Sequence, residues 1–279
     1  MEMKQQQFTG NNKLLLGIVL GVITFWLFAQ SLLNLVPTIQ HSFSSSIGTT
    51  SIAISITALF SGMFVVGAGS FADKLGRVKM TYIGLILSII GSLLIIVTPF
   101  TPMLILGRII QGLSAAAIMP STLAIIKTYY QGSDRQRALS FWSIGSWGGS
   151  GFASLFGGMI DTAIGWRWIY IISIIVAILA ILLIKGTPET KANQTTNTKF
   201  DFVGLTLFVI MMLSINVVIT QSAKLGLFSP TILALIAVFI ISTIIFVRVE
   251  MKMHYPLIDF KLFNNKAYTS ATVSNFMLN

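Results

Sequence analysis

A short motif runs from Gly69 to Lys79 between two apolar runs and reads Gly69-Ser-Phe-Ala-Asp73-Lys74-Leu-Gly76-Arg77-Val-Lys79. Its glycines allow a tight turn and a close approach of helices. The Asp73 carboxylate can accept hydrogen bonds from amides at a helix N-terminus, whose positive end favours an anion. The Arg77 guanidinium can hold a carboxylate with two hydrogen bonds. Basic residues alone would fit a loop that merely sets membrane topology, whereas this more specific order of glycine, acid and base predicts a functional role.

Apolar sequence surrounds this stretch and makes up most of the chain. Of the 279 residues, 54% are hydrophobic and 9% are charged, and the mean hydropathy is +0.86. A soluble domain carries about 25% charged residues, and a disordered chain has low hydrophobicity, so both classes are excluded. The sequence has no cysteine, which excludes disulfides, thiol nucleophiles and cysteine-ligated metals. The composition predicts an all-α integral membrane protein.

Eight apolar runs are long enough to cross the hydrocarbon core of a bilayer, which takes about 20 helical residues. They lie at residues 13–36, 49–71, 80–98, 103–126, 138–161, 166–184, 202–222 and 229–247. A ninth run begins near Thr269 and is too short to cross before Asn279. We therefore expect the chain to be the N-terminal portion of a longer protein, with a truncated ninth span and without a C-terminal half.

The basic residues predict which way the chain crosses the membrane. With the N-terminus in the cytoplasm, fifteen of the 18 Lys and Arg residues lie in inside segments, whereas Arg167 and Lys224 lie outside and Arg108 lies within a span. Cytoplasmic loops carry this excess of positive charge, so a cytoplasmic N-terminus is expected. The same distribution explains the net charge of +10. The bilayer is therefore the expected partner, and nucleic acid is not.

The spans and polar segments predict five parts of the chain. A six-span bundle is followed by a cytoplasmic linker rich in Gly, Pro, Thr and Asn, two extra central spans, a second cytoplasmic loop and the start of the ninth span. These parts are residues 1–185, 186–201, 202–247, 248–268 and 269–279.

Arg108 is the basic residue placed inside a span, in the sequence LILGRIIQG of residues 104–112. At 1.5 Å per residue it lies ~8 Å below the outer end of its helix. A charge at membrane depth is costly and predicts a function, and Gln111 and Gly112 share its helix face. The alternative is that the side chain extends to the outer interface.

Small residues crowd the fifth span, GSWGGSGFASLFGG at residues 145–158. Small residues allow close helix packing in any membrane bundle. The positions that make up this helix-packing motif are Gly145, Gly149, Ala153, Ser154, Gly157 and Gly158.

Residues 69–79 closely resemble the signature between the second and third spans of the major facilitator superfamily, and residues 104–112 resemble its fourth-span motif. Residues 145–158 are similar to the Gly-rich motif of drug/proton antiporters, although Ala153-Ser154 stands where that family has Gly-Pro. The segments GWRWI, LIKGTPETK and HYPLIDFKLF extend the resemblance to the Nor-type quinolone and multidrug efflux pumps of Gram-positive bacteria, in the fourteen-span antiporter branch.

This resemblance implies a superfamily-type N-terminal six-helix bundle plus two additional transmembrane helices. It also implies export of amphipathic drugs such as quinolones from a bacterial cell, across the plasma membrane, with the proton gradient as energy source and no bound cofactor. Residues 69–79 would latch the first half to the second, through Gly69, Asp73, Lys74, Gly76, Arg77 and Lys79. Without a second half, we expect this chain not to transport by itself.

Polar and aromatic side chains at membrane depth predict a transport pathway. Trp26, Gln30 and Asn34 follow an i, i+4, i+8 spacing that puts them on one face of a regular helix, and Trp147 can form a facing wall. Arg108 and Gln111 complete the predicted pathway. Hydrogen bonding between helices without substrate contact is the alternative.

The acidic residues fall outside mid-membrane, so any proton-coupling acid is expected in the missing half, with Asp161 the nearest candidate here. Clustered acid–base or metal-binding residues at membrane depth are absent, as is a phosphate-binding GxxxxGK(S/T) loop. An enzyme, a metal site and an ATP-driven pump are therefore not expected. A transporter of another metabolite and a non-transporting membrane subunit remain alternatives, and the oligomeric state is open.

Overall fold

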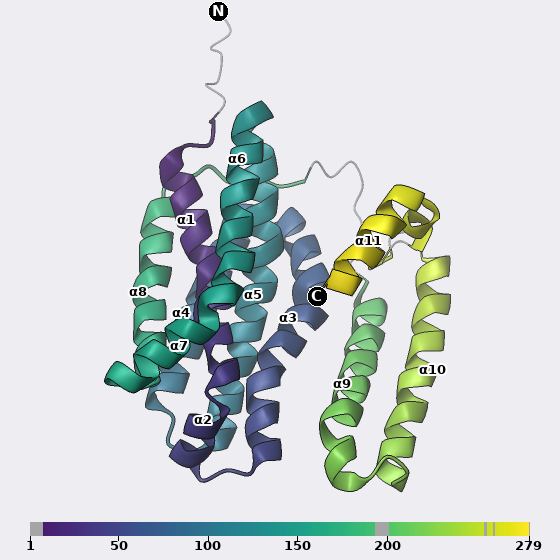
Figure 1. The fold of residues 1–279 in the computed structure, drawn as a ribbon. Coiled ribbons are helices and arrows are strands. Elements are labelled where there is room, and N and C mark those ends of the chain that lie inside the picture. The colour runs from purple at the N-terminus through teal and green to yellow at the C-terminus, as the bar shows by residue number, and fades with distance from the viewer. Residues whose placement is uncertain (1–7, 193–200, 254–255, 259, 279) are drawn as a thin grey trace, which may run out of the picture. The chain divides into compact units, whose positions relative to one another are not determined.

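The computed structural model describes residues 8–192, 201–253, 256–258 and 260–278, and every regular element within these ranges is helical (Figure 1). Helices suit a membrane because they satisfy their own backbone hydrogen bonds. The chain forms two compact units, Met1–Asn193 and Gln194–Asn279.

The first unit holds a bundle of long helices, which are labelled in Figure 1. Its elements are α1 (Asn12–Ile23), η1 (Thr24–Ala29), η2 (Gln30–Asn34), α2 (Val36–Phe43), α3 (Ile47–Leu75), α4 (Arg77–Val97), α5 (Thr101–Tyr129), α6 (Gly132–Ser143), η3 (Ile144–Gly148), α7 (Gly149–Ile164) and α8 (Arg167–Ile184).

The second unit is a helical hairpin followed by shorter helices. Its elements are α9 (Phe202–Leu225), α10 (Pro230–Lys252), η4 (Phe260–Asn264) and α11 (Lys266–Leu278). α9 and α10 lie side by side (Figure 1). Asp201 caps α9 by accepting the Gly204 amide at 2.7 Å, and Ser229 caps α10, which begins at Pro230. Proline suits this first position because its missing N–H has no partner there.

Seven helices in the described residues are long and apolar enough to cross a membrane, judged by length and composition. The predicted run at 138–161 falls on α6, η3 and α7, which are each shorter than 18 residues. The backbone stays right-handed helical at both junctions, Ile144 and Gly149, so one helical path runs from Gly132 to Ile164. The predicted all-α membrane fold, a six-helix bundle with two additional helices, is confirmed.

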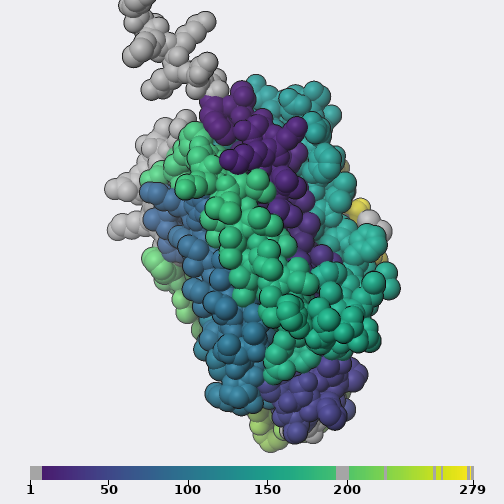
Figure 2. Space-filling view, turned by 90° about the vertical axis from the view of Figure 1, so that its left-hand side faces the viewer, coloured from purple at the N-terminus to yellow at the C-terminus, as the bar shows by residue number. Residues whose placement is uncertain are grey.

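α5 forms the centre of the first unit because small residues let its neighbours approach. A Cβ on Gly112 would lie 2.6 Å from the Thr57 carbonyl oxygen of α3, and a Cβ on Gly107 would lie 3.0 Å from the Gly91 carbonyl oxygen of α4. α8 lies between α1 and α4 on one face of this unit and contacts both, as Figure 2 shows. These close contacts place the buried polar side chains of α5 deep in the bundle.

The first span departs from a regular helix at mid-length. η1 is a π-helix and η2 is a 3₁₀-helix, so a wide turn is followed by a tight one. The fifth span has a matching irregularity at η3, which is also a π-helix. Such π segments are rare and occur often at functional sites.

Candidate functional site

The Arg108 side chain is buried in the bundle, with an exposed fraction of 0%. Its guanidinium donates hydrogen bonds from Nη1 to the Ala29 carbonyl oxygen at 2.6 Å and from Nη2 to the Ile54 carbonyl oxygen at 2.9 Å. A weaker bond runs from Nε to the Ala53 carbonyl at 3.4 Å. One planar group with five donors thus joins α5 to α3 and to the first span, instead of extending to the outer surface.

The carbonyl of Ala29 explains why the guanidinium is needed at this point. Ala29 ends the π segment and Gln30 begins the 3₁₀ segment, so the backbone hydrogen-bond pattern changes between them. Burying a cation costs less free energy when carbonyl oxygens surround it than when it has no partner. Arg108 therefore stabilises the irregular part of the first span.

Further polar groups surround Arg108 and connect three helices. Gln111 accepts a hydrogen bond from Arg108 Nη1 at 3.1 Å and donates one to Ser92 of α4 at 3.3 Å. Thr57 of α3 donates to the Arg108 carbonyl oxygen at 2.9 Å. The buried Tyr170 of α8 lies beside Arg108 and interacts with it electrostatically. We call Arg108, Gln111, Thr57 and Ser92 the polar core cluster.

An aromatic pair lies where the two π segments meet. Trp26 of η1 stacks on Trp147 of η3, with ring centroids 5.9 Å apart and planes at 28°. The Trp26 indole N–H also points at the Met119 sulfur of α5, at 3.4 Å. Trp147 is 52% exposed, so the pair presents a flat aromatic surface with a polarizable thioether beside it. The predicted facing of Trp26 and Trp147 is found in the structure.

The expected common face of Trp26, Gln30 and Asn34 is not formed as predicted. That expectation used the spacing of an α-helix, whereas the chain turns as a π-helix up to Ala29 and as a 3₁₀-helix from Gln30. A 3₁₀-helix turns by about 120° per residue, so the four-residue spacing from Gln30 carries Asn34 away from the common face. Gln30 is half-buried and Asn34 is exposed.

The Gly-rich residues of the fifth span divide into two sets. Gly145, Gly149, Ala153 and Gly157 recur every four residues and pack closely: a Cβ on Gly149 would lie 3.1 Å from the Trp26 Cβ, and one on Gly157 would lie 2.9 Å from the Ser31 carbonyl oxygen. Ala153 is buried. The other set faces away, because Ser154 is exposed and a Cβ on Gly158 would meet nothing within 4 Å.

An apolar groove of about 600 Å³ lies between the first and fifth spans. Its lining includes Ile23 and Leu27 from the first span and Ile144, Phe152 and Met159 from the fifth. Gly148 and Gly149 form part of its floor, because their missing side chains leave room. The groove therefore follows the same seam as the aromatic pair.

The stretch 69–79 forms a helix–turn–helix instead of an extended loop. α3 continues to Leu75 and α4 begins at Arg77, so the turn is Gly76, whose φ of 126° favours glycine. Gly69 lies farther up α3 and allows an approach to Pro120 of α5, since its Cβ would be 3.4 Å from that ring. Lys74 is half-buried and Lys79 is exposed.

Asp73 and Arg77 are paired across the turn. Both Nε and Nη2 of Arg77 bond to the same oxygen, Oδ1 of Asp73, at 3.0 and 2.9 Å. Arg77 Nη1 also donates to the Thr128 hydroxyl of α5 at 2.7 Å. Asp73 was expected to accept helix N-terminal amides, but it lies in the last turn of α3, four residues before Arg77. Arg77 is therefore within its reach, and another acid holds the amides of α4.

That acid is Glu189, which the sequence interpretation left without a role. Its Oε1 accepts the Val78 amide and its Oε2 accepts the Lys79 amide, each at 2.9 Å. The negative carboxylate thus caps the positive N-terminus of α4. The Arg77 amide donates to the Thr190 carbonyl oxygen at 2.9 Å. A signal was present in the sequence: α4 starts after Gly76 without a capping side chain of its own.

Three further acidic residues, Asp161, Asp201 and Glu250, differ in their surroundings. Asp161, near the end of α7, accepts a hydrogen bond from Thr38 at 2.8 Å. Asp201 and Glu250, which were assigned to polar inside segments, are buried in the second unit. Asp259 lies outside the described residues. In the part of the chain that the structure describes, no group of three or more His, Cys, Asp and Glu residues is placed to hold a metal ion.

Known proteins with similar sequences share nearly the full length of this chain. The quinolone resistance protein NorB of Staphylococcus aureus strain MRSA252 is 62% identical over 275 residues, which is 99% of this chain and 59% of that protein. The protein of the same name from strain Newman gives the same identity and coverage. This chain therefore spans about three-fifths of the length of these relatives.

Solved structures support the fold at low sequence identity. A peptide transporter POT in complex with sulfate aligns with a TM-score of 0.64 and 14% identity, over 91% of this chain and 57% of that one. A bacterial homologue of the human lysosomal transporter Spinster, in an inward-facing conformation, aligns with a TM-score of 0.52 and 18% identity, over 81% of this chain and 56% of that one.

The family assignment follows from the sequence itself. The model of the Major Facilitator Superfamily matches residues 16–277, which is most of the chain. This is a family of membrane transporters and not of enzymes, as expected from the motifs around Asp73 and Arg108. With its apolar helices and its NorB relatives, the chain is a multi-pass protein of the bacterial membrane. The chain belongs to the Major Facilitator Superfamily.

Proposed function

We propose that this chain forms the first eight spans of a multidrug exporter of the plasma membrane, which moves quinolone-type drugs outward in exchange for protons. The observation that carries the proposal is the 62% identity to quinolone resistance proteins over 99% of the chain. The N-terminus is cytoplasmic in this proposal, because the excess of Lys and Arg then lies inside.

The geometry of the first unit suits an amphipathic, flat cargo. Trp26 and Trp147 offer stacked aromatic rings, and Met119 adds a soft side chain beside them. Aromatic and thioether groups bind apolar molecules of varied shape with few directional demands. The apolar groove between the first and fifth spans extends this surface. These features support a broad drug range better than a site for one polar metabolite.

Transport is proposed to need more than this chain. In alternating access, one bundle rocks against another around a central site, and the first unit supplies only one bundle. The turn at Gly76, held by Glu189 and by the Asp73–Arg77 pair, is one side of the proposed latch between bundles. The chain by itself is therefore expected to be inactive.

Drug accumulation in pump-deficient bacteria tests this proposal. Cells would express the 279-residue chain, or the chain lengthened with the C-terminal part of a NorB relative, and accumulation of norfloxacin and ethidium would be measured with and without a protonophore. We expect the lengthened protein alone to lower accumulation and the protonophore to abolish its effect. A variant of the lengthened protein, Trp147→Ala, removes one ring of the aromatic pair and should weaken export of both drugs.

Two results would contradict the proposal. If the lengthened protein reaches the membrane but leaves both drugs unchanged, the cargo is not a drug of this class. If the short chain lowers accumulation without added sequence, the two-bundle requirement is wrong.

A further inference from the structure

Two buried carboxylates lie at one end of the α9–α10 hairpin. Asp201, the cap of α9, is 4% exposed, and Glu250, near the end of α10, is 2% exposed. Each uses one oxygen for a backbone amide: Asp201 Oδ1 accepts the Gly204 N–H at 2.7 Å, and Glu250 Oε2 accepts the Ile258 N–H at 2.9 Å. The other two oxygens, Asp201 Oδ2 and Glu250 Oε1, have no hydrogen-bond partner among the described residues.

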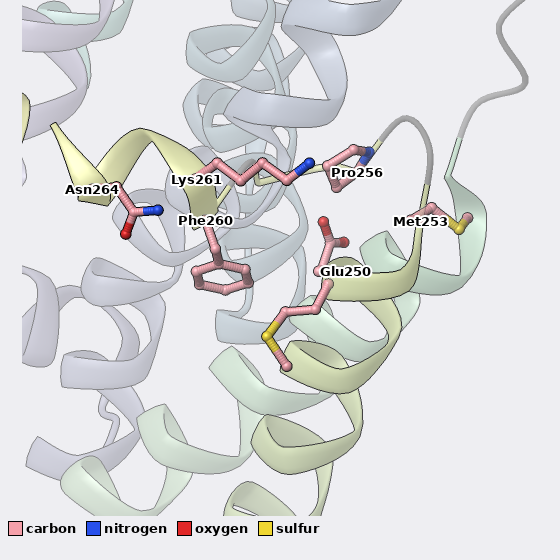
Figure 3. A pocket seen from close by; sticks show the side chains of 7 residues that line it. Glu250, Met253, Pro256, Phe260, Lys261 and Asn264 are labelled. Carbon is pink, nitrogen blue, oxygen red and sulfur yellow. The ribbon is translucent and has the colours of Figure 1, made fainter.

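The two unpartnered oxygens point into the same space. A Cβ on Gly204 would collide with both Asp201 Oδ2 and Glu250 Oε1. Glycine is therefore the residue that leaves room for the two carboxylates on one side of α9. The Glu250 carboxylate also faces a pocket of about 460 Å³ lined by Phe260, Lys261 and Asn264 (Figure 3).

Electrostatics disfavours two ionised carboxylates in this arrangement. Like charges that share a buried site repel, and one of them then keeps its proton. An unpaired buried oxygen also costs free energy. A single proton between Oε1 and Oδ2 removes one charge and gives both oxygens a hydrogen-bond partner.

The dipoles of α9 and α10 favour the proton on one of the two carboxylates. Asp201 lies at the N-terminus of α9, where the helix dipole favours an anion, whereas Glu250 lies in the last turn of α10, where the dipole disfavours one. The proton therefore belongs to Glu250, and Asp201 accepts its hydrogen bond.

Charged neighbours lie around the pair on each adjoining element. Lys261 of η4 lines the pocket that Glu250 faces. Arg248 and Lys252 flank Glu250 on α10, and Lys266 begins α11; these four side chains are exposed. Asp259 and His254 lie outside the described residues. A metal ion would need more ligands than the pair supplies, and the described residues hold no group of three or more His, Cys, Asp and Glu placed to bind one.

We propose that Asp201 and Glu250 form a proton-binding site, in which protonated Glu250 donates from Oε1 to Asp201 Oδ2. The Oε2 atom of Glu250 then holds residues 256–258 against the hairpin through the Ile258 amide. Loss of the proton leaves two facing anions, which weakens this attachment. The site is a property of the second unit and does not depend on drug export.

Infrared difference spectroscopy of the whole chain in lipid nanodiscs tests this site, because a protonated carboxyl has its own carbonyl band. The variants are Glu250→Gln and Asp201→Asn, which keep the side-chain shape, and the control is Asp134→Asn, at an exposed acid in the first turn of α6. We expect the wild-type chain and the control to show the band at mildly acidic pH, where ordinary carboxyls are already ionised, and to lose it as the pH rises through neutral. Glu250→Gln should lack the band, and Asp201→Asn should shift it.

Thermal unfolding gives a second readout of the same site. A proton bound more tightly in the folded chain stabilises it at low pH, and this stability is lost as pH rises. The melting temperature of the wild-type chain should therefore fall more steeply between mildly acidic and neutral pH than that of Glu250→Gln. A wild-type spectrum without the band at mildly acidic pH would overturn the proposal. So would magnesium or calcium ions that raise the melting temperature of the wild-type chain and leave that of Glu250→Gln unchanged.

Discussion

The two units use the same kind of polar side chain in different ways. In the first unit, some buried hydroxyl groups bond across helices: Ser114 of α5 donates to the Gly84 carbonyl oxygen of α4 at 2.8 Å, and Thr81 of α4 bonds to Ser121 of α5 at 3.1 Å. In the second unit, Ser214 and Ser242 are buried but donate to carbonyls of their own helices. Hydroxyls therefore help to fix helix positions in the bundle. In the hairpin, the polar groups of α9 and α10 that approach each other are Asp201 and Glu250, at one end.

Burial follows the same division. In the apolar windows of the first unit's candidate spans, between 28% and 61% of the residues are buried, with 61% in α5, compared with 22% in α9 and 17% in α10. Lipid tails are as apolar as the side chains, so helices in a membrane associate through close packing and hydrogen bonds. The first unit has both along its helices, and substitutions there should cost more than matched ones in the hairpin.

Arg108→Ala should give the largest loss. It removes the bonds to the Ala29 and Ile54 carbonyls and leaves a cavity at the centre of the bundle. A large-to-small change in a core costs about 3 kcal/mol in free energy of unfolding, which denaturant titration in mild detergent can measure. Arg108→Met fills most of the space and should lose less. A Met variant as stable as the wild-type chain would show that the guanidinium does not stabilise the π segment.

Gly157→Ala should give the next largest loss, because its Cβ would meet the Ser31 carbonyl oxygen of the first span. Forcing an extra carbon into a packed contact costs about 2 kcal/mol. The neighbouring Gly158→Ala has open space and should be neutral or stabilising by up to about 1 kcal/mol. Equal effects of the two changes in the same titration would mean that the fifth span does not pack on the first through this face.

Glu189→Ala should cost about 1 kcal/mol, as the loss of a helix cap does. The variant leaves the Val78 and Lys79 amides of α4 without their carboxylate. Glu189→Gln keeps one acceptor oxygen, so its free energy of unfolding should lie between those of the wild-type chain and Glu189→Ala. Hydrogen exchange at the first turn of α4 is the local measurement, and unchanged exchange in Glu189→Ala would rule out the cap.

Ser114→Ala and Ser242→Ala give the smallest effects and the most direct test of the contrast between the units. Hydrogen bonds between membrane helices contribute about 0.6 kcal/mol on average, so Ser114→Ala should lose about that much. Ser242→Ala removes a bond within one helix and should be nearly neutral. A larger loss for Ser242→Ala would mean that the hairpin, too, is held by its serine.

The sequence predicted the spans well because hydrophobic length is a local property. The run 103–126 lies within α5, and 166–184 differs from α8 by one residue at its start. The π segments were not predicted, since they depend on the packing of Trp26 against Trp147 and on the Arg108 bond to Ala29. A regular helical repeat assumed there misplaced Asn34.

Contacts between distant segments could not be read from the chain. Glu189 lies more than one hundred positions after the amides that it caps, and Asp201 and Glu250 meet because α9 and α10 form a hairpin. Each of these acids looked like an ordinary residue of a polar segment. By contrast, the roles of Gly76 and Arg108 have local signals: a turn between two apolar runs and a charge inside one.

The proposed drug/proton exporter needs two bundles, and this chain would supply one of them. Proteoliposomes with an internal pH-sensitive dye test it, with the 279-residue chain in one set and the chain lengthened by the C-terminal part of a NorB relative in another. We predict that norfloxacin triggers proton movement in the lengthened set and none in the short set. Norfloxacin-triggered proton movement by the short chain would contradict the claim.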